Sequence, residues 1–422
     1  MHRFGSFILI ELTYDCNLRC RYCYLGRERD SRLMSYDTFR SVIDEIFDGI
    51  VVSHLDRKIT IELHGGEPLL AGEDFICSAV SYILCRARER KIGSLNLCIQ
   101  TNGLLLTERI LRVFRDAGVS LGVSLDGIDC IDNSMRLPSP DLLRRIENNL
   151  TIADCIGMRY GLVSVVSDAN IYGIESLYSE LRKRHSGLSS CKMIPMFDTE
   201  KIGEGVDAKT FLRKVILPVY RSFLKGRPDV GSWSRVVSRV VQDIISFHTD
   251  SCQSTCNFRF CGSGLNICSI GPEGELYTCD RMNTRVREES KLRSSLRDPD
   301  LLGLQQLRSA VSFCVELSSV QKKRGCDSCT FRYSCTGTCA KMMKSASGSY
   351  GIYRFDCELT TLMYGYIESD LENVLESIEK NYGGRYSMIE DRALEVKDRV
   401  LGSFGFRGEI LDNGRTIRIE RL

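Results

Sequence analysis

The sequence predicts an α/β protein: an open, partial (β/α)6 barrel similar to a TIM barrel, followed by a loop-rich C-terminal domain. Three observations support this fold class. Six short runs of apolar and β-branched residues recur through the first half of the chain, stretches with helical periodicity separate them, and most of the 20 cysteines lie between Cys252 and Cys357. Each connection is long enough to join parallel strands, so the alternation indicates a parallel sheet.

The expected strands are, in chain order, Phe7–Leu12, Lys58–Leu63, Leu95–Ile99, Ser120–Leu125, Gly161–Val166 and Met193–Met196. Helices between them are predicted at Ser35–Ile46, Phe75–Arg90 and Thr107–Ala117, the last ending at Gly118 because glycine favours the position after a helix. We assign residues 1–198 to the barrel core. Functional residues of such barrels gather at the carboxyl ends of the strands.

The rest of the chain divides into three segments. Residues 199–251 are predicted to form a helical connector, and residues 252–360 a loop-rich domain dense in thiols. In the tail, residues 361–422, a long helix is expected to run to about Tyr382. Asp412-Asn413-Gly414 then indicates a tight hairpin turn between two apolar runs.

Charge and composition exclude several classes of protein. Lys+Arg 57 against Asp+Glu 55 gives a net charge of +2, so we expect no nucleic-acid partner. The first apolar run, Phe7–Ile10, is too short for a signal peptide or a membrane span, and we therefore predict a cytoplasmic protein with no membrane partner. The 20 cysteines among 422 residues fall below the roughly 8–10% of disulfide-stapled secreted chains. Clustered thiols in a reducing compartment instead indicate metal or redox chemistry.

A first group of thiols follows the first expected strand directly. Cys16, Cys20 and Cys23 lie on one loop, where three thiolates can hold three irons of a cubane cluster and leave the fourth iron open. A zinc site is the alternative, but structural zinc prefers four closed ligands. Three unconnected thiols are a further alternative. The spacing favours an iron–sulfur cluster.

The C-x3-C-x2-C spacing, with the aromatic Tyr22 before the last cysteine, resembles the radical S-adenosylmethionine (SAM) superfamily. The resemblance implies that the open iron of a [4Fe–4S] cluster binds the amino and carboxylate groups of S-adenosylmethionine. An electron then cleaves the sulfonium, and the resulting 5′-deoxyadenosyl radical abstracts a hydrogen atom from the substrate. Tyr22 takes the position that lies near the adenine.

Further motifs fit a nucleoside site. In His64-Gly65-Gly66-Glu67-Pro68 the glycines would let a ligand approach the backbone, and Glu67 offers a carboxylate to an ammonium group, although a simple turn is the alternative. By the resemblance, Gly65, Gly66 and Glu67 hold the methionine part, while Ser124 and Arg136 hold the ribose and the carboxylate. Arg136 could equally be a surface residue.

Two other segments bear on this site. Gln100-Thr101-Asn102-Gly103, which closes the third strand, also resembles the family, with a strand end and turn as the alternative. Asp132-Asn133 departs from the family, because many relatives carry a His-Asp pair before the arginine.

The C-terminal thiols resemble the SPASM extension of peptide-modifying radical enzymes, which implies two auxiliary [4Fe–4S] clusters and three clusters in all. Carried over in order, the first auxiliary cluster would use Cys256, Cys261, Cys279 and Cys339, and the second Cys326, Cys329, Cys335 and Cys357. Cys252 is the other candidate for the place given to Cys256. Zinc knuckles are the alternative for the block from Cys326 to Cys339.

Asp280 follows Cys279 directly and is the candidate catalytic residue. In the sulfatase-maturating branch of the resembled family a Cys-Asp pair at this place supplies the general base, and a carboxylate beside an anionic cluster should have a raised proton affinity. The alternative is a solvated loop aspartate. The next residues, Arg281-Met282-Asn283, differ from the aromatic-rich run expected of a sulfatase maturase.

These residues predict a radical SAM oxidoreductase that acts on a peptide or protein, first of all a maturase of ribosomally made peptides that forms a crosslink or inverts a stereocentre. The alternatives are an anaerobic sulfatase maturase, which oxidises Cys or Ser to formylglycine, and a non-catalytic electron carrier. An electron donor such as flavodoxin or ferredoxin is implied by the resemblance. Because the first strand begins by Phe7, we expect no fused leader-binding domain, which leaves room for a separate leader-peptide-binding protein or for none.

Overall fold

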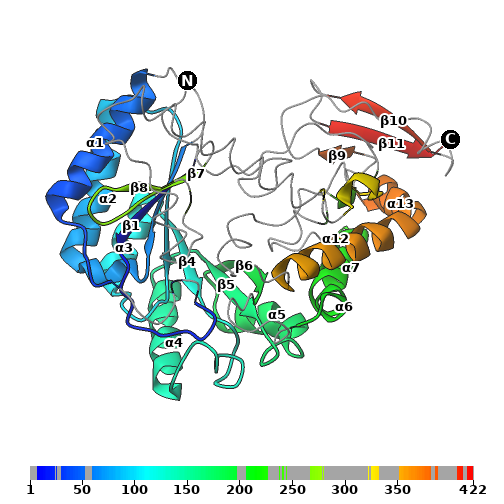
Figure 1. Ribbon diagram of the computed structural model, residues 1–422, viewed down its shortest axis with the longest axis horizontal. Coiled ribbons are helices and arrows are strands. Elements are labelled where there is room, and N and C mark those ends of the chain that lie inside the picture. The colour runs from blue at the N-terminus through cyan, green and yellow to red at the C-terminus, as the bar shows by residue number, and fades with distance from the viewer. Residues whose placement is uncertain are drawn as a thin grey trace.

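The computed structural model describes residues 7–23, 25, 30–52, 59–196, 206–226, 237, 240–241, 244, 267–277, 279, 322, 325–331, 351–381, 385–387, 406–411 and 416–421. Its centre is an eight-stranded sheet in the order β6-β5-β4-β3-β2-β1-β7-β8 (Figure 1). The strands are β1 Phe7–Thr13, β2 Ile59–Gly65, β3 Leu95–Thr101, β4 Ser120–Ser124, β5 Tyr160–Val166, β6 Leu188–Pro195, β7 Ile267–Ile270 and β8 Leu276–Tyr277.

The six strands predicted from the sequence are confirmed, and they pair in parallel from β1 to β6. Helices fill the connections: α1 Tyr36–Val52, η1 Pro68–Ala71, α2 Glu73–Glu89, α3 Glu108–Ala117, α4 Pro140–Cys155 and α5 Ile174–Arg184. In this sheet β6 stands at one edge and β8 at the other, so the described strands form an open α/β barrel as expected.

The edge next to β1 differs from the expectation. β7 comes from the segment assigned to the thiol-rich domain, yet it pairs in parallel with β1, with Phe7 opposite Ile267 and Ile10 opposite Ile270. β8 then returns antiparallel to β7. A four-residue run of buried residues carries too little periodicity to be recognised as a strand in sequence. The domain limits stay a prediction.

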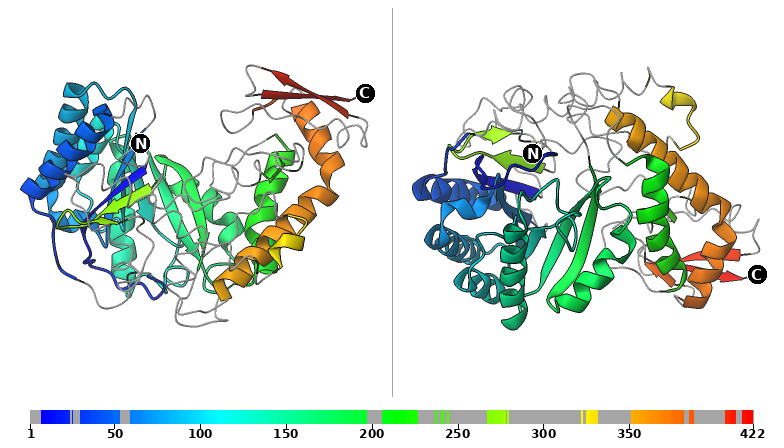
Figure 2. Two further views of the ribbon diagram at one scale, coloured as in Figure 1. Left: turned by 45° about the horizontal axis from the view of Figure 1, so that its top comes forward. Right: turned by 90° about the horizontal axis from the view of Figure 1, so that it is seen from below.

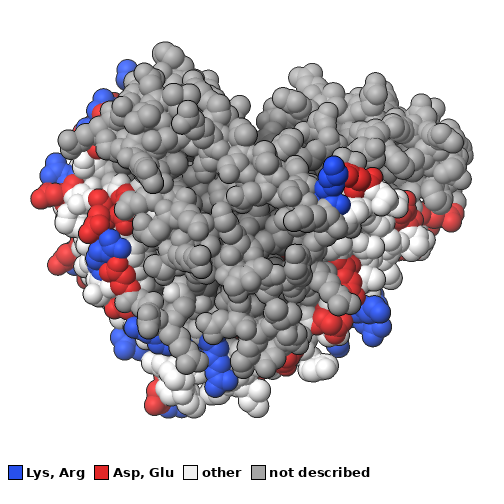
Figure 3. Space-filling view, in the orientation of Figure 1, with Lys and Arg blue, Asp and Glu red and all other residues white. Residues whose placement is uncertain are grey.

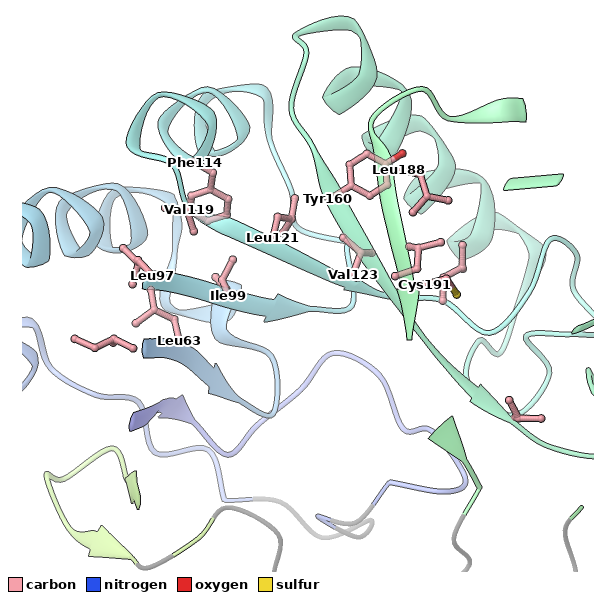
Figure 4. Packing of buried hydrophobic residues seen from close by; sticks show 14 of the residues in the cluster. Leu63, Leu97, Ile99, Phe114, Val119, Leu121, Val123, Tyr160, Leu188 and Cys191 are labelled. Carbon is pink, nitrogen blue, oxygen red and sulfur yellow. The ribbon is translucent and has the colours of Figure 1, made fainter. Parts of the chain in front are cut away.

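Alternation along the strands separates two faces of the sheet. In β2, Ile61 and Leu63 are fully buried on the helix side, whereas Glu62 and His64 lie partly exposed on the other face. Figure 4 shows the apolar side, where Leu97 of β3 and Leu121 and Val123 of β4 belong to the same buried cluster as Phe114 of α3. The core therefore lies between sheet and helices, and in β2 the opposite face carries polar side chains.

Capping fixes the helices near their predicted ends. The Thr107 hydroxyl accepts a hydrogen bond from the Ile110 backbone N–H at 3.2 Å and so begins α3. Gly118 ends it with a φ of 67°, in the left-handed region that glycine adopts at low cost. α1 begins after Ser35, whose hydroxyl accepts from the Thr38 N–H at 3.0 Å.

The connector and the C-terminal helices pack against each other (Figure 2). The connector contains α6 Ala208–Phe211, the π-helical η2 Leu212–Ile216 and α7 Leu217–Leu224; the C-terminal helices are α12 Gly351–Ser369 and α13 Leu371–Asn381. The helical stretch predicted to run to about Tyr382 is confirmed, but it consists of two helices because the chain breaks at Asp370. That carboxylate accepts a hydrogen bond from the Tyr220 hydroxyl of α7 at 2.6 Å, and the break places it there.

The tail forms a three-stranded sheet in the order β10-β11-β9, from Phe406–Leu411, Thr416–Arg421 and Arg385–Ser387. β10 and β11 pair antiparallel, as the hairpin signal predicts, although the turn residues Asp412-Asn413-Gly414 lie outside the described residues. No described helix is long and apolar enough to cross a membrane. Where the visible face in Figure 3 is described, basic and acidic side chains are intermixed.

Candidate active site

The loop after β1 carries the three N-terminal thiols. Cys16 is buried, Cys20 and Cys23 are partly exposed, and the Cys23 N–H donates to the Cys20 carbonyl at 3.1 Å in a tight turn. Burial raises the pKa of the Cys20 thiol; the Arg136 charge acts against this, and the charges of Cys23 and Cys16 add to it. Cys20 therefore lies close enough to the other two thiols for their charges to affect its pKa. The described residues contain no group of three His, Cys, Asp or Glu side chains arranged to hold a single metal ion.

Gly65 and Gly66 bring the loop after β2 against the backbone that precedes the thiol loop. The Gly66 N–H donates to the Thr13 carbonyl at 2.8 Å, and the Glu67 N–H donates to the Asp15 carbonyl at the same distance. A Cβ atom on Gly66 would lie 2.6 Å from the carbonyl carbon of Asp15, closer than real Cβ contacts. We expected the glycines to make room for a ligand; in the structure they make room for the chain itself.

Glu67 is wholly buried, and its carboxylate accepts three hydrogen bonds from the chain. Oε1 accepts from the Leu69 N–H at 3.0 Å and from the Thr101 hydroxyl at 2.7 Å, and Oε2 accepts from the Asn102 N–H at 2.7 Å. Burial raises the pKa of this carboxyl, against the effect of the hydrogen bonds. Its contacts thus differ from the open carboxylate we expected for an ammonium group: Glu67 joins the ends of β2 and β3.

Replacing Glu67 by Gln should destabilise this junction. The amide nitrogen of glutamine would face a hydrogen-bond donor, so one buried acceptor is lost and two donors oppose each other. We expect Glu67→Gln to lower the free energy of unfolding by about 1–3 kcal/mol, measured by denaturant titration. Glu62→Gln, on the partly exposed face of the same strand, is the matched control and should change stability by less than about 0.5 kcal/mol. Equal stability of E67Q and the wild type would contradict the junction role.

Arg136, on the loop after β4, is buried rather than exposed on the surface. Its side chain is 9% exposed, and Nε lies 3.4 Å from Asp126 Oδ1. Burial opposes the charged form, but the Asp126 carboxylate, together with the charges of Tyr22 and Cys20, raises the pKa of the guanidinium. Nε makes no hydrogen bond in the described part of the chain. A buried cation with an unfilled donor suits a carboxylate ligand, which is the chemistry that S-adenosylmethionine presents.

Tyr22 connects the thiol loop to the loop after β4. Its hydroxyl donates to Asp126 Oδ2, and the Arg136 guanidinium stands 5.6 Å from the centre of its ring. Burial raises the pKa of Tyr22 well above its usual value. Two further contacts join the thiol loop to the loop after β4. The Arg21 N–H donates to the Met135 carbonyl at 2.8 Å, and Cys20 Sγ lies 3.9 Å from the Arg136 carbonyl. The thiol loop is thereby fixed beside Arg136.

Asp126 was not predicted from the sequence, although it lies only two residues after the predicted site residue Ser124. Asp126 is 1% exposed; Oδ1 accepts from the Val165 N–H at 2.9 Å and faces Arg136, while Oδ2 faces Tyr22. Asn133 belongs to the Asp132-Asn133 pair that departs from the family. It fixes the backbone of Asp126, because its Oδ1 accepts from the Asp126 N–H at 2.9 Å. An acidic residue just past a buried strand was the available signal. Ser124, at the end of β4, accepts from Gln100 Nε2 at 2.9 Å.

The C-terminal thiols are described only in part. Cys279 is buried two residues after β8. Tyr14 contacts the preceding β7–β8 hairpin through a hydrogen bond from its hydroxyl to Glu275 Oε1 at 2.9 Å. Cys326 and Cys329 share the short turn of η3, Cys326–Ser328, and Cys357 lies exposed on α12. The other expected ligands and the expected base lie outside the described residues: Cys252, Cys256, Cys261, Cys335, Cys339 and Asp280. Both auxiliary ligand sets therefore stay a prediction.

Comparisons with known proteins agree with this geometry. Residues 10–154 match the Radical SAM superfamily. The serine-type anaerobic sulfatase-maturating enzyme of Klebsiella pneumoniae is 28% identical over 363 residues, which cover 81% of this chain and 83% of that one. The cysteine-type enzyme of Clostridium novyi is 25% identical over 297 residues, which cover 65% of this chain and 73% of that one.

Two solved structures share the fold. The enzyme anSMEcpe with bound AdoMet superposes with a TM-score of 0.69 at 18% identity, covering 89% of this chain and 97% of that one. SuiB of Streptococcus suis bound to precursor peptide SuiA superposes with a TM-score of 0.53 at 13% identity, covering 80% of this chain and 72% of that one.

Proposed function

From the premise that the chain is a radical SAM enzyme, we propose that it cleaves S-adenosylmethionine at the loop after β1 and abstracts a hydrogen atom from one residue of a peptide or protein. The observation that carries the proposal is the contact between the thiol loop, through Tyr22, and the buried pair Asp126 and Arg136. It brings a thiol donor set for a cluster and an unfilled cationic donor for a carboxylate to the same end of the sheet.

The chain's own residues have distinct tasks in this proposal. Cys16, Cys20 and Cys23 would hold three irons, and when bound the cluster supplies the electron that cleaves the sulfonium. Arg136 would receive the carboxylate of the cofactor through its guanidinium, and Asp126, whose Oδ1 lies 3.4 Å from Nε, keeps that guanidinium in place. Ser124, at the end of β4, would hold the ribose. Gly65 and Gly66 would offer backbone carbonyls to the ammonium group, because the Glu67 carboxylate is engaged with the chain.

The relatives favour oxidation of a Cys or Ser side chain to formylglycine. The alignments with the sulfatase-maturating enzymes span most of the length of those proteins. This supports a common reaction more strongly than the shared fold of SuiB does. From serine the reaction removes two protons and two electrons; from cysteine, water also enters and hydrogen sulfide leaves. One electron departs with the abstracted hydrogen atom. The second would pass to an auxiliary cluster and on to a flavodoxin or ferredoxin, with Asp280 as the proposed base.

Crosslinking or epimerisation of a ribosomally made peptide is the second candidate. Arg281-Met282-Asn283 favours it, because a sulfatase maturase is expected to carry an aromatic-rich run there. In that case a separate leader-binding protein is a proposed partner.

An anaerobic assay tests the cofactor chemistry first. The reconstituted protein, incubated with S-adenosylmethionine and dithionite, should release 5′-deoxyadenosine and methionine, measured by liquid chromatography. Samples that lack dithionite should release neither product. A reduced, cluster-containing protein that forms no 5′-deoxyadenosine would support the electron carrier and overturn the proposal.

A substrate assay then separates the two enzyme reactions. A short sulfatase-type peptide with a target Cys or Ser should lose mass and gain an aldehyde that reacts with a hydrazine probe. If 5′-deoxyadenosine forms while both peptides keep their mass, formylglycine formation is excluded. Peptides encoded beside the gene are then the substrates to test for a crosslink or an inverted centre.

A further inference from the structure

Cys16 has a hydrogen-bonding environment that its two partner thiols lack among the described residues. It is the most buried of the three, and its Sγ accepts from the Leu18 backbone N–H at 3.3 Å. A second donor is Asn102 Nδ2, 3.7 Å from the same sulfur. The Asn102 donor comes from the end of β3, far from the thiol loop in sequence.

The Asn102 amide is held in one orientation by the chain around it. Its Oδ1 accepts from the Leu104 N–H at 3.0 Å, so the oxygen faces its own loop and the nitrogen faces the thiol loop. The nitrogen also donates to Asn17 Oδ1 at 2.6 Å. The Asn102 backbone N–H donates to Glu67, which anchors the residue from behind. If the Asn102 amide were flipped, its NH2 group would face the Leu104 N–H. Two donors cannot form a hydrogen bond, so the flip would lose the bond from Leu104.

A fixed donor beside a ligand sulfur has an electronic consequence. Hydrogen bonds to cluster sulfurs stabilise the extra negative charge of the reduced state, and they are one of the means by which proteins set cluster potentials. Asn102 is 5% exposed and Cys16 is 8% exposed, so little water competes for the sulfur. The donor therefore acts where the surroundings screen it least.

We propose that Asn102 is a positioning residue that donates an N–H···S hydrogen bond to the Cys16 thiolate and thereby raises the reduction potential of the cluster held by the thiol loop. This inference rests on the proposed cluster site. It assigns to the segment Gln100-Thr101-Asn102-Gly103 a task that a plain strand end would not have. A higher potential makes the reduction of the cluster by its electron donor easier. Asn102 has this effect without touching the substrate.

Asn102→Asp is the variant that tests it. Aspartate keeps the size of asparagine and the oxygen that accepts from Leu104, but it loses the donor and adds a negative charge. The matched control is Asn149→Asp on α4. Asn149 Nδ2 donates to the Gly103 carbonyl at 2.9 Å. The control therefore adds the same charge and loses the same amide at the same loop, and within the described residues Asn149 makes no hydrogen bond to a thiol. Asn102→Leu removes the donor without adding charge.

The readout is the midpoint potential of the N-terminal cluster, from a redox titration followed by electron paramagnetic resonance in protein whose auxiliary-cluster cysteines are replaced. At a fixed poise we expect the reduced-to-oxidised ratio to fall about tenfold in Asn102→Asp, which corresponds to a shift of about 59 mV for one electron. Asn102→Leu should shift it in the same direction, and Asn149→Asp clearly less than Asn102→Asp.

Each outcome decides a separate claim. If wild-type protein assembles no cluster at the thiol loop, the proposed function fails. If the cluster assembles and Asn102→Asp shifts no further than Asn149→Asp, this inference alone is wrong. Should the variants fail to fold, electron–nuclear double resonance on wild-type protein with 15N-labelled asparagine decides: a coupled 15N and an exchangeable proton support the bond, and their absence overturns it.

Discussion

Replacing Cys20 by Ser should abolish 5′-deoxyadenosine formation. The Cys20 side chain is partly buried and packs against the hydrophobic core, and serine differs from it only by oxygen in place of sulfur, so the fold should persist. A serine hydroxyl is a poor ligand for iron–sulfur clusters, which thiolates hold. With two thiolates left on the loop, the cluster should not assemble there, and iron content should fall together with product formation in chemical and chromatographic assays.

Cys155→Ser is the matched control for this loss. Cys155 is an exposed thiol at the end of α4. Its replacement should leave iron content and 5′-deoxyadenosine formation at the wild-type level. Full product formation by Cys20→Ser would show that the thiol loop is not the site of cofactor cleavage.

Replacing Gly66 by Ala should disrupt the junction between the loops after β1 and β2. A methyl group there would overlap backbone atoms of Tyr14 and Asp15, and backbone cannot move aside as a flexible side chain can. The hydrogen bonds from the Gly66 and Glu67 N–H groups to Thr13 and Asp15 would then break or lengthen. We expect the free energy of unfolding to fall by about 3 kcal/mol or more, and binding of S-adenosylmethionine to weaken at least tenfold, measured by denaturant titration and calorimetry.

Gly93→Ala provides the comparison for Gly66→Ala. Gly93 lies in the exposed loop before β3, and a Cβ atom there would meet nothing within 4 Å. The substitution should change stability by less than about 0.5 kcal/mol. If Gly66→Ala were as stable as Gly93→Ala, the loop after β2 would have to be able to move away from the thiol loop, against the close contact described here.

The sequence predicted the barrel strands well because each one alternates or continues in apolar residues against a helical face. Ile59, Ile61 and Leu63 show this in β2, where every second residue is buried. The pairing of β7 with β1 could not be predicted in the same way. This pairing joins residues about 260 positions apart, and the sequence of the four residues of β7 does not indicate which strand they pair with.

The candidate site was predicted unevenly for a related reason. Motif spacing found Cys16, Gly66 and Arg136, since their places along the chain carry the signal. The tasks of Asp126 and Asn102 depend on which groups the fold brings to their side chains: Asp126 meets Tyr22 across 104 positions, and Asn102 meets Cys16 across 86. The position of a residue in the sequence does not predict such long-range side-chain contacts.

The place of β7 beside β1 has a consequence for how the protein is made. Among the strands of the described sheet β1 is synthesised first, yet one of its two neighbours follows only after residue 266. Until then the nascent chain carries β1 with an unpaired edge, a surface on which foreign strands can align. Folding of the thiol loop next to that strand is therefore completed late in synthesis, when the distant hairpin arrives to cover the edge.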